Sequence, residues 1–153
     1  MGLNWPDNNH NYVPAYQMSG LPYVTGTTAT GVSTTPLQIK FPYVTRWIYV
    51  RNTGAQVLRL GFTELAMNGP LSDDIGDCGG YNVTGSNRNY INIPAGNQAT
   101  MMSDLGPLEI KCTKIFLRSH TSTTGFELIA GYTAIPENQM LVLTGANGFQ
   151  GVG

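Results

Sequence analysis

Three aspartates stand close together in a glycine-rich stretch, SDDIGDCGG, near the middle of the chain. Carboxylate oxygens at this spacing are the hard ligands that Ca²⁺ binds in proteins. Asp73, Asp74 and Asp77 are therefore candidate calcium ligands, although they do not match the EF-hand loop pattern. The alternative is a solvated acidic turn that holds no metal, and the residues alone leave both interpretations open.

Histidine and cysteine, which perform much of protein chemistry, are scarce in this chain. It contains only His10 and His120, and only Cys78 and Cys112. None of them belongs to a nucleophile-elbow, metalloprotease, phosphate-loop or Cys-x-x-Cys motif. Both histidines are expected to be surface side chains, and we expect no enzymatic activity, no catalytic residue and no cofactor. Two cysteines make no disulfide framework, so thiols are expected, with a Cys78–Cys112 bridge left open.

The composition favours an all-β protein with many loops. The chain has 153 residues, which fits one domain. Only 11% of the residues are charged, against about 25% in typical soluble domains. Glycine, asparagine and serine, which favour turns, and threonine, which favours strands, make up the difference.

The formal net charge of -1 bears on the partners of the protein. A near-neutral surface promotes association between molecules, so we expect a homo-oligomer, with a monomer as the alternative. No basic patch is present to bind phosphates, and we expect no nucleic acid partner. No apolar run approaches the roughly 20 residues of a membrane span. No signal peptide is recognisable, so synthesis in the cytoplasm is expected.

Short apolar segments predict strands rather than helices. They lie at 36–42, 45–52, 57–62, 90–94, 98–102, 108–119, 126–135 and 140–145. Alternation predicts that Arg59 points away from the core, and bulk on both faces of 45–52 predicts a strand covered on both sides. The predicted core consists of Leu37, Ile39, Phe41, Ile48, Val50, Leu58, Leu60, Phe62, Ile91, Ile93, Leu117, Phe126 and Leu128.

The segment LEIKCTKIFLRS contains two alternation patterns. Leu108, Ile110 and Cys112 share one parity, whereas Ile115 and Leu117 have the other. Because a one-residue slip moves every side chain to the opposite face of a sheet, we expect a bulge or break near Thr113.

About eight short strands separated by turn residues are typical of a β-sandwich or jelly roll. We therefore predict an all-β protein, a single jelly-roll β-sandwich of about eight antiparallel strands. The predicted organisation is an extended N-terminal arm over 1–35, a jelly-roll domain over 36–144 and a Gly-rich, irregular C-terminal tail over 145–153. Residues 67–89 form a long insertion, of a length that is usually functional or mobile.

The N-terminal arm is unusually rich in aromatic residues. Prolines at positions 6, 14 and 22 forbid a helix and favour extended backbone. Aromatic residues and methionine anchor protein interfaces, and an extended segment can pair with a neighbouring subunit. The C-terminal tail carries one further aromatic residue. The candidate interface anchors are Trp5, Tyr12, Tyr16, Met18, Tyr23 and Phe149. Alternatively, both ends fold back onto their own domain.

The segments KIFLRS and FELIAGYTAIP, followed by the tail LTGANGFQGVG, suggest a family. From Thr45 to Gly153 the chain resembles single jelly-roll capsid proteins of the penton type. These belong to double-stranded DNA viruses whose major capsid protein has two jelly rolls. The resemblance implies two four-stranded sheets, a pentamer at each five-fold vertex of an icosahedral capsid, contacts with neighbouring capsid proteins, and a location in the virion.

Other functions remain open at this point. The aromatic arm departs from the penton pattern and would also suit a minor capsid, cement or head-decoration protein. A carbohydrate-binding β-sandwich would instead use exposed aromatic side chains, for which Tyr43, Tyr81 and Tyr90 are candidates.

Overall fold

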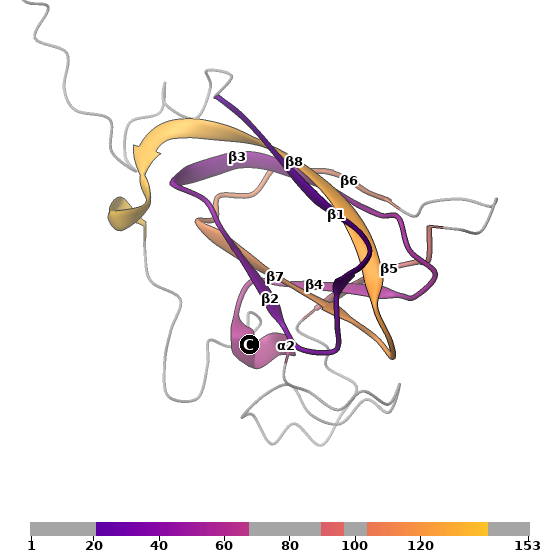
Figure 1. Ribbon diagram of the computed structural model, residues 1–153. Coiled ribbons are helices and arrows are strands. Elements are labelled where there is room, and N and C mark those ends of the chain that lie inside the picture. The colour runs from indigo at the N-terminus through magenta and orange to yellow at the C-terminus, as the bar shows by residue number, and fades with distance from the viewer. Residues whose placement is uncertain (1–20, 68–89, 97–103, 141–153) are drawn as a thin grey trace, which may run out of the picture.

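The computed structural model describes residues 21–67, 90–96 and 104–140 (Figure 1). The predicted strand at 98–102 and nearly all of the one at 140–145 lie outside these ranges. So do the predicted tail at 145–153 and residues 68–89 of the predicted insertion.

Eight strands and two short helical turns make up the described part of the chain. Their bounds are β1 (Pro22–Val32), β2 (Leu37–Lys40), β3 (Tyr43–Asn52), β4 (Leu58–Gly61), α2 (Glu64–Met67), β5 (Ile91–Ile93), β6 (Asp104–Leu108), β7 (Lys114–Ser119), β8 (Thr124–Pro136) and the 3-10 turn η1 (Glu137–Gln139).

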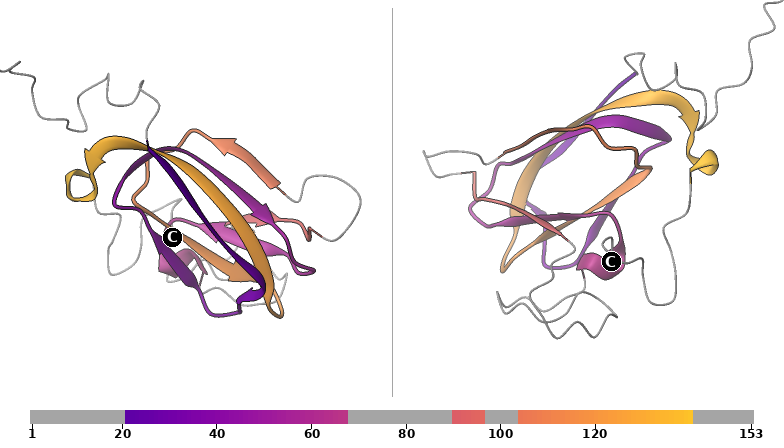
Figure 2. Two further views of the ribbon diagram at one scale, coloured as in Figure 1. Left: turned by 45° about the horizontal axis from the view of Figure 1, so that its top comes forward. Right: turned by 180° about the vertical axis from the view of Figure 1, so that it is seen from behind.

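The strands form two four-stranded sheets with the orders β1-β8-β3-β6 and β2-β7-β4-β5. Every neighbouring pair is antiparallel. Figure 1 shows the sheets as two layers, with β8 and β3 in one and β7, β4 and β2 in the other, and both views of Figure 2 show the same two layers.

This strand order is that of a jelly roll. β1 pairs with β8, β2 with β7, β3 with β6, and β4 with β5. The first four strands therefore run against the last four, as in one long hairpin. Wrapping that hairpin into a sandwich brings β3 beside β8 and β4 beside β7. The predicted fold class, a single jelly-roll β-sandwich of antiparallel strands, is confirmed.

The predicted boundary of the N-terminal arm is wrong in part. We expected residues 1–35 to be an arm, but Pro22–Val32 is strand β1, paired with β8 from Pro22 to Thr27 in a regular register. Threonine, valine and tyrosine, which favour strands, outweigh the glycines of this segment because β8 supplies a partner. The arm thus ends no later than Leu21.

The core lies between the two sheets. Ten of the predicted core residues are buried there: Ile39, Phe41, Ile48, Val50, Leu58, Leu60, Ile93, Leu117, Phe126 and Leu128. Leu37 and Phe62 are half-buried and pack against this cluster. Ile91 is a wrong prediction, since it is 39% exposed at the start of the three-residue edge strand β5. In so short an edge strand, an alternating sequence pattern does not ensure that each apolar side chain is buried.

The predicted break near Thr113 is confirmed. β6 ends at Leu108 and β7 begins at Lys114, and the five residues between them carry the chain from one sheet to the other. The buried Thr45 hydroxyl donates to the Ile110 carbonyl at 2.8 Å and accepts from the Cys112 backbone N–H at 3.0 Å. This connection is therefore fastened to the first half of β3.

A second polar contact fastens the other end of β3. Asn52 is fully buried, and its amide donates to the carbonyls of Gln56 at 2.6 Å and Pro94 at 2.8 Å. Its side-chain oxygen accepts from the Gly54 N–H at 3.1 Å and the Thr124 hydroxyl at 2.9 Å. Asn52 therefore joins the ends of strands that belong to different sheets, β3 and β8 in one and β5 in the other.

Replacing Asn52 with alanine should lower the free energy of unfolding by about 2–4 kcal/mol, because buried donors and acceptors lose their partners together. Urea denaturation measures the change. Gln38→Ala, at an exposed position of β2, is the control and should cost less than about 0.5 kcal/mol. Equal effects of the two substitutions would show that the Asn52 contacts do not hold the sandwich together.

Candidate interaction surface

The outer face of the β1-β8-β3-β6 sheet carries a row of apolar side chains. Val24 on β1 and Tyr49 on β3 both pair in register with Ile129 on β8, which lies between them. Val24 is 72% exposed and Ile129 is 37% exposed. Residues opposite one another on neighbouring strands project on the same side of the sheet. The three side chains therefore form one continuous row.

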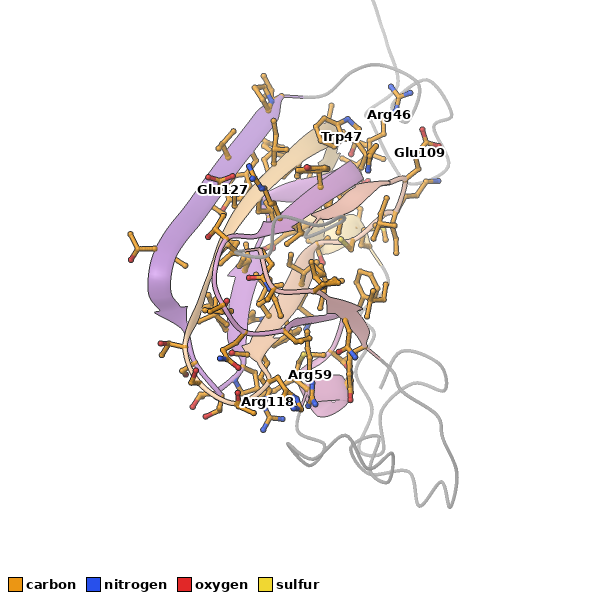
Figure 3. All side chains as sticks on the ribbon, turned by 90° about the vertical axis from the view of Figure 1, so that its right-hand side faces the viewer. Arg46, Trp47, Arg59, Glu109, Arg118 and Glu127 are labelled. Carbon is orange, nitrogen blue, oxygen red and sulfur yellow. The ribbon has the colours of Figure 1, made fainter. Side chains whose placement is uncertain are left out.

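A second apolar row lies beside the first. Pro22 on β1 and Trp47 on β3 both pair with Gly131 on β8. A Cβ at position 131 would lie 2.4 Å from the indole Nε1 of Trp47, so glycine is needed for the Trp47 ring to lie across β8. Figure 3 shows Trp47 on this sheet, with Arg46 and Glu109 near it.

A polar row limits the apolar area toward the other end of the sheet. Arg51 on β3 pairs with Glu127 on β8, and their side chains form an ion pair at 3.7 Å. Both side chains are more than half exposed, so the pair contributes little to stability. We name the area beyond this pair the apolar outer face; it consists of Pro22, Val24, Trp47, Tyr49 and Ile129.

A contiguous apolar area differs in meaning from scattered exposed apolar residues, which are normal on protein surfaces. Contiguous patches with a polar rim mark sites of protein–protein contact. Tryptophan and tyrosine are also the side chains that interfaces favour. The apolar outer face is therefore the candidate functional site in the described part of the chain.

The candidate anchor Tyr23 does not belong to this face. Its ring lies on the opposite side of β1, 5.5 Å from the Phe41 ring in an edge-on arrangement and 5.4 Å from the Tyr132 ring. Tyr23 packs against the protein's own core, so its expected role as an anchor for a neighbour is corrected. The other candidate anchors, Trp5, Tyr12, Tyr16, Met18 and Phe149, lie outside the described residues.

The outer face of the second sheet is different in character, because two arginines on it are buried. Arg59 on β4 and Arg118 on β7 are register partners, and Figure 3 shows both close to α2. The Arg59 guanidinium lies 4.6 Å from the centre of the Tyr90 ring and donates to His120 Nδ1 at 2.7 Å. Burial, followed by repulsion from Arg59, lowers the pKa of Arg118.

Arg118 ties the surrounding loops to this sheet. Its Nε donates to the Thr34 carbonyl at 2.7 Å, and its Nη1 donates to the carbonyl of Met67, at the end of α2. The sequence pattern predicted correctly that Arg59 points away from the core. It did not predict that both arginines are covered, because the covering residues, Tyr90 among them, lie far away in the sequence.

The histidine and cysteine side chains in the described part of the chain make structural contacts. His120 follows β7 and was expected on the surface, but it is half-buried against Arg59. Burial raises the pKa of the Cys112 thiol to about 11, and a hydrogen bond with Thr45 offsets only part of that rise. Cys112 is thus a neutral thiol at physiological pH and a poor nucleophile.

Most of the remaining candidates fall in segments that the structure does not describe. Asp73, Asp74, Asp77, Cys78, His10 and Tyr81 lie outside the described residues. Within residues 21–67, 90–96 and 104–140, no three His, Cys, Asp or Glu side chains group in a way that could hold a metal ion. The same ranges contain no apolar helix of membrane-spanning length. Tyr43 lies on β3, whereas Tyr90 directly precedes β5 of the other sheet, and the two rings contact different partners.

Comparison of the chain with models of protein families, with curated protein sequences and with solved structures finds no match.

The Cys112 thiol should react slowly with iodoacetamide in the folded protein. In a Cys78→Ser background at pH 8, we expect a rate roughly 100-fold below that of a free cysteine, since a raised pKa leaves few thiolates. The rate should still rise with pH above pH 9, where the rate of an ordinary thiol levels off. The urea-unfolded chain is the control and should react as a free thiol does. A folded-state rate equal to the unfolded one would contradict the assigned burial.

Proposed function

We propose that this chain is a viral structural protein, and specifically the penton subunit that forms the pentameric vertices of an icosahedral capsid. The observation that carries the proposal is a jelly roll in which one sheet exposes a contiguous apolar outer face. Jelly rolls recur in viral capsid proteins, although they also occur in lectins and cupins. The fold supports this function only by analogy. The exposed apolar outer face is the observation that favours assembly over a lectin or cupin function.

The second sheet supports the same function by contrast. Its outer face is covered by Tyr90, α2 and the loops that Arg118 binds, whereas the apolar outer face is open in the described part of the chain. A subunit with two different sides suits a ring, in which one surface of each copy meets a different surface of the next. Such a heterologous contact closes after five copies when the rotation between neighbours is 72° by symmetry.

In this function the chain works through shape and contacts. The core keeps the two sheets rigid, and the near-neutral surface allows close approach of identical copies without strong repulsion. Neighbouring capsid proteins are the other proposed partners. The chain is made in the cytoplasm of the host cell and works in the virion, without catalysis, a cofactor or nucleic acid binding.

A second candidate is a minor capsid, cement or head-decoration protein, which the same apolar outer face would serve. The two candidates differ in the symmetry of the assembly and in its position on the shell. A carbohydrate-binding module is a third candidate, but Tyr43 lies on β3 and Tyr90 precedes β5 of the other sheet, so the two rings form no common platform for a sugar.

The purified full-length protein should show five times the mass of one chain by native mass spectrometry, with concentration-dependent dissociation. Ile129→Lys, which places a charge in the centre of the apolar outer face, should weaken this assembly at least tenfold. Gln38→Lys adds the same charge on the outer side of the other sheet and is the matched control. It should assemble as the unchanged protein does.

Two results would count against the proposal. A monomer at all concentrations, in the absence and presence of the other capsid proteins, would contradict the assembly function. A pentamer that Ile129→Lys leaves intact would show that the contact between copies does not use the apolar outer face. Electron microscopy of the particles that contain the chain then separates a vertex position from a cement or decoration position.

A further inference from the structure

The four outermost strands of the two sheets differ in how well they are protected against pairing with another chain. β2 has four residues between Pro36 and Pro42, and β5 has three residues followed by Pro94. β6 has five residues and contains Gly106 and Pro107. Short strands and prolines discourage edge pairing. β1 is eleven residues long and has no proline after its first residue.

The open edge of β1 also has a definite pattern of donors and acceptors. The Leu21 carbonyl accepts from the Tyr132 N–H at 3.0 Å, so the backbone groups of Leu21 face β8. Those groups alternate along an antiparallel strand. The N–H and C=O groups of Val24 and Gly26, within the regular register that ends at Thr27, therefore face away from β8. β1 contains no charged residue, so nothing on the strand repels a neutral partner.

We propose that the edge of β1 between Pro22 and Thr27 accepts residues 1–20 of a second copy as an added strand. This inference rests on the proposed function, because an assembly is what brings a second copy close. The added strand forms backbone hydrogen bonds with Val24 and Gly26. Its alternate side chains extend the apolar outer face beyond Val24.

Residues 1–20 fit this site by their position and their charge. They join the described structure at Leu21, the start of the same edge strand, so each copy presents both an arm and an edge. Twenty extended residues span up to about 66 Å, which is enough to cross a neighbouring domain. Asp7 is the one residue of the segment that carries a full charge at neutral pH. Residues 7–13, between the prolines, all retain a backbone N–H.

Two variants test the two halves of the contact. Val24→Pro removes an edge-facing N–H and adds a ring on the side where the partner strand must lie. It leaves the pairing with β8 intact, since Pro22 already occupies an equivalent position two residues earlier. Val24→Thr is the matched control, because it keeps both the N–H and the β-branched shape. Deletion of residues 1–20 removes the arm and leaves β1.

We expect Val24→Pro and the deletion variant to keep the circular dichroism and melting temperature of a folded sandwich and to lose self-association by tenfold or more. Val24→Thr should assemble normally. Hydrogen exchange at the Gly26 amide should be slow in the unchanged assembly and fast in both disrupted variants. Mixing Val24→Pro, which retains the arm, with the deletion variant, which retains the edge, should restore a one-to-one complex visible by native mass spectrometry.

Several outcomes would overturn the inference. Folded variants that form no complex when mixed would do so, as would a Val24→Pro protein that assembles and protects its edge normally. Slow exchange at the Gly26 amide in a monomer would show that each arm covers its own edge. If the unchanged protein forms pentamers while the edge amides exchange fast, this inference fails and the proposed function stands. A protein that stays monomeric under all conditions would contradict both this inference and the proposed function.

Discussion

β3 is fixed at both of its ends by buried side chains, and the arrangement of the two sheets depends on this. Thr45 binds the connection that leads from one sheet to the other, and Asn52 binds carbonyls and a hydroxyl from strands of both sheets. β3 is also a central strand, between β8 and β6. The apolar core provides most of the stabilisation of such a sandwich, but hydrophobic burial is not directional and does not specify which groups meet. The two polar contacts determine which strand ends meet.

The two sheets use their outer faces in opposite ways. One sheet carries a buried arginine pair beneath Tyr90 and beside α2, so its outer face is occupied by the chain itself. The other carries an exposed apolar face, limited by the ion pair between Arg51 and Glu127. The described cysteine and histidine side chains, Cys112 and His120, make structural contacts, and the proposed assembly function rests on this asymmetry between the two outer faces.

Alternation within single segments predicted the fold class, the break near Thr113 and most of the core. It succeeded where strands are long enough and have partners on both sides, as for Ile48 and Val50 in β3. It failed where the outcome depends on distant residues. Tyr23 was assigned to an arm because nothing near it reveals β8 as its partner. Arg59 was predicted to point outward, but its cover by Tyr90 comes from beyond a long insertion. The apolar outer face was missed because its rows combine three strands.

The pairing of the first strand with the last has a consequence for the protein during its synthesis. β8 begins at Thr124, about 100 residues after the start of β1 at Pro22. At about 5–20 residues per second, a ribosome needs roughly 5–20 seconds to produce that stretch. Through this interval β1 has no strand to pair with, and neither of its edges is covered. A nascent chain of this topology therefore folds late. Neighbouring incomplete copies on one messenger RNA expose their uncharged β1 segments to each other until β8 has been made.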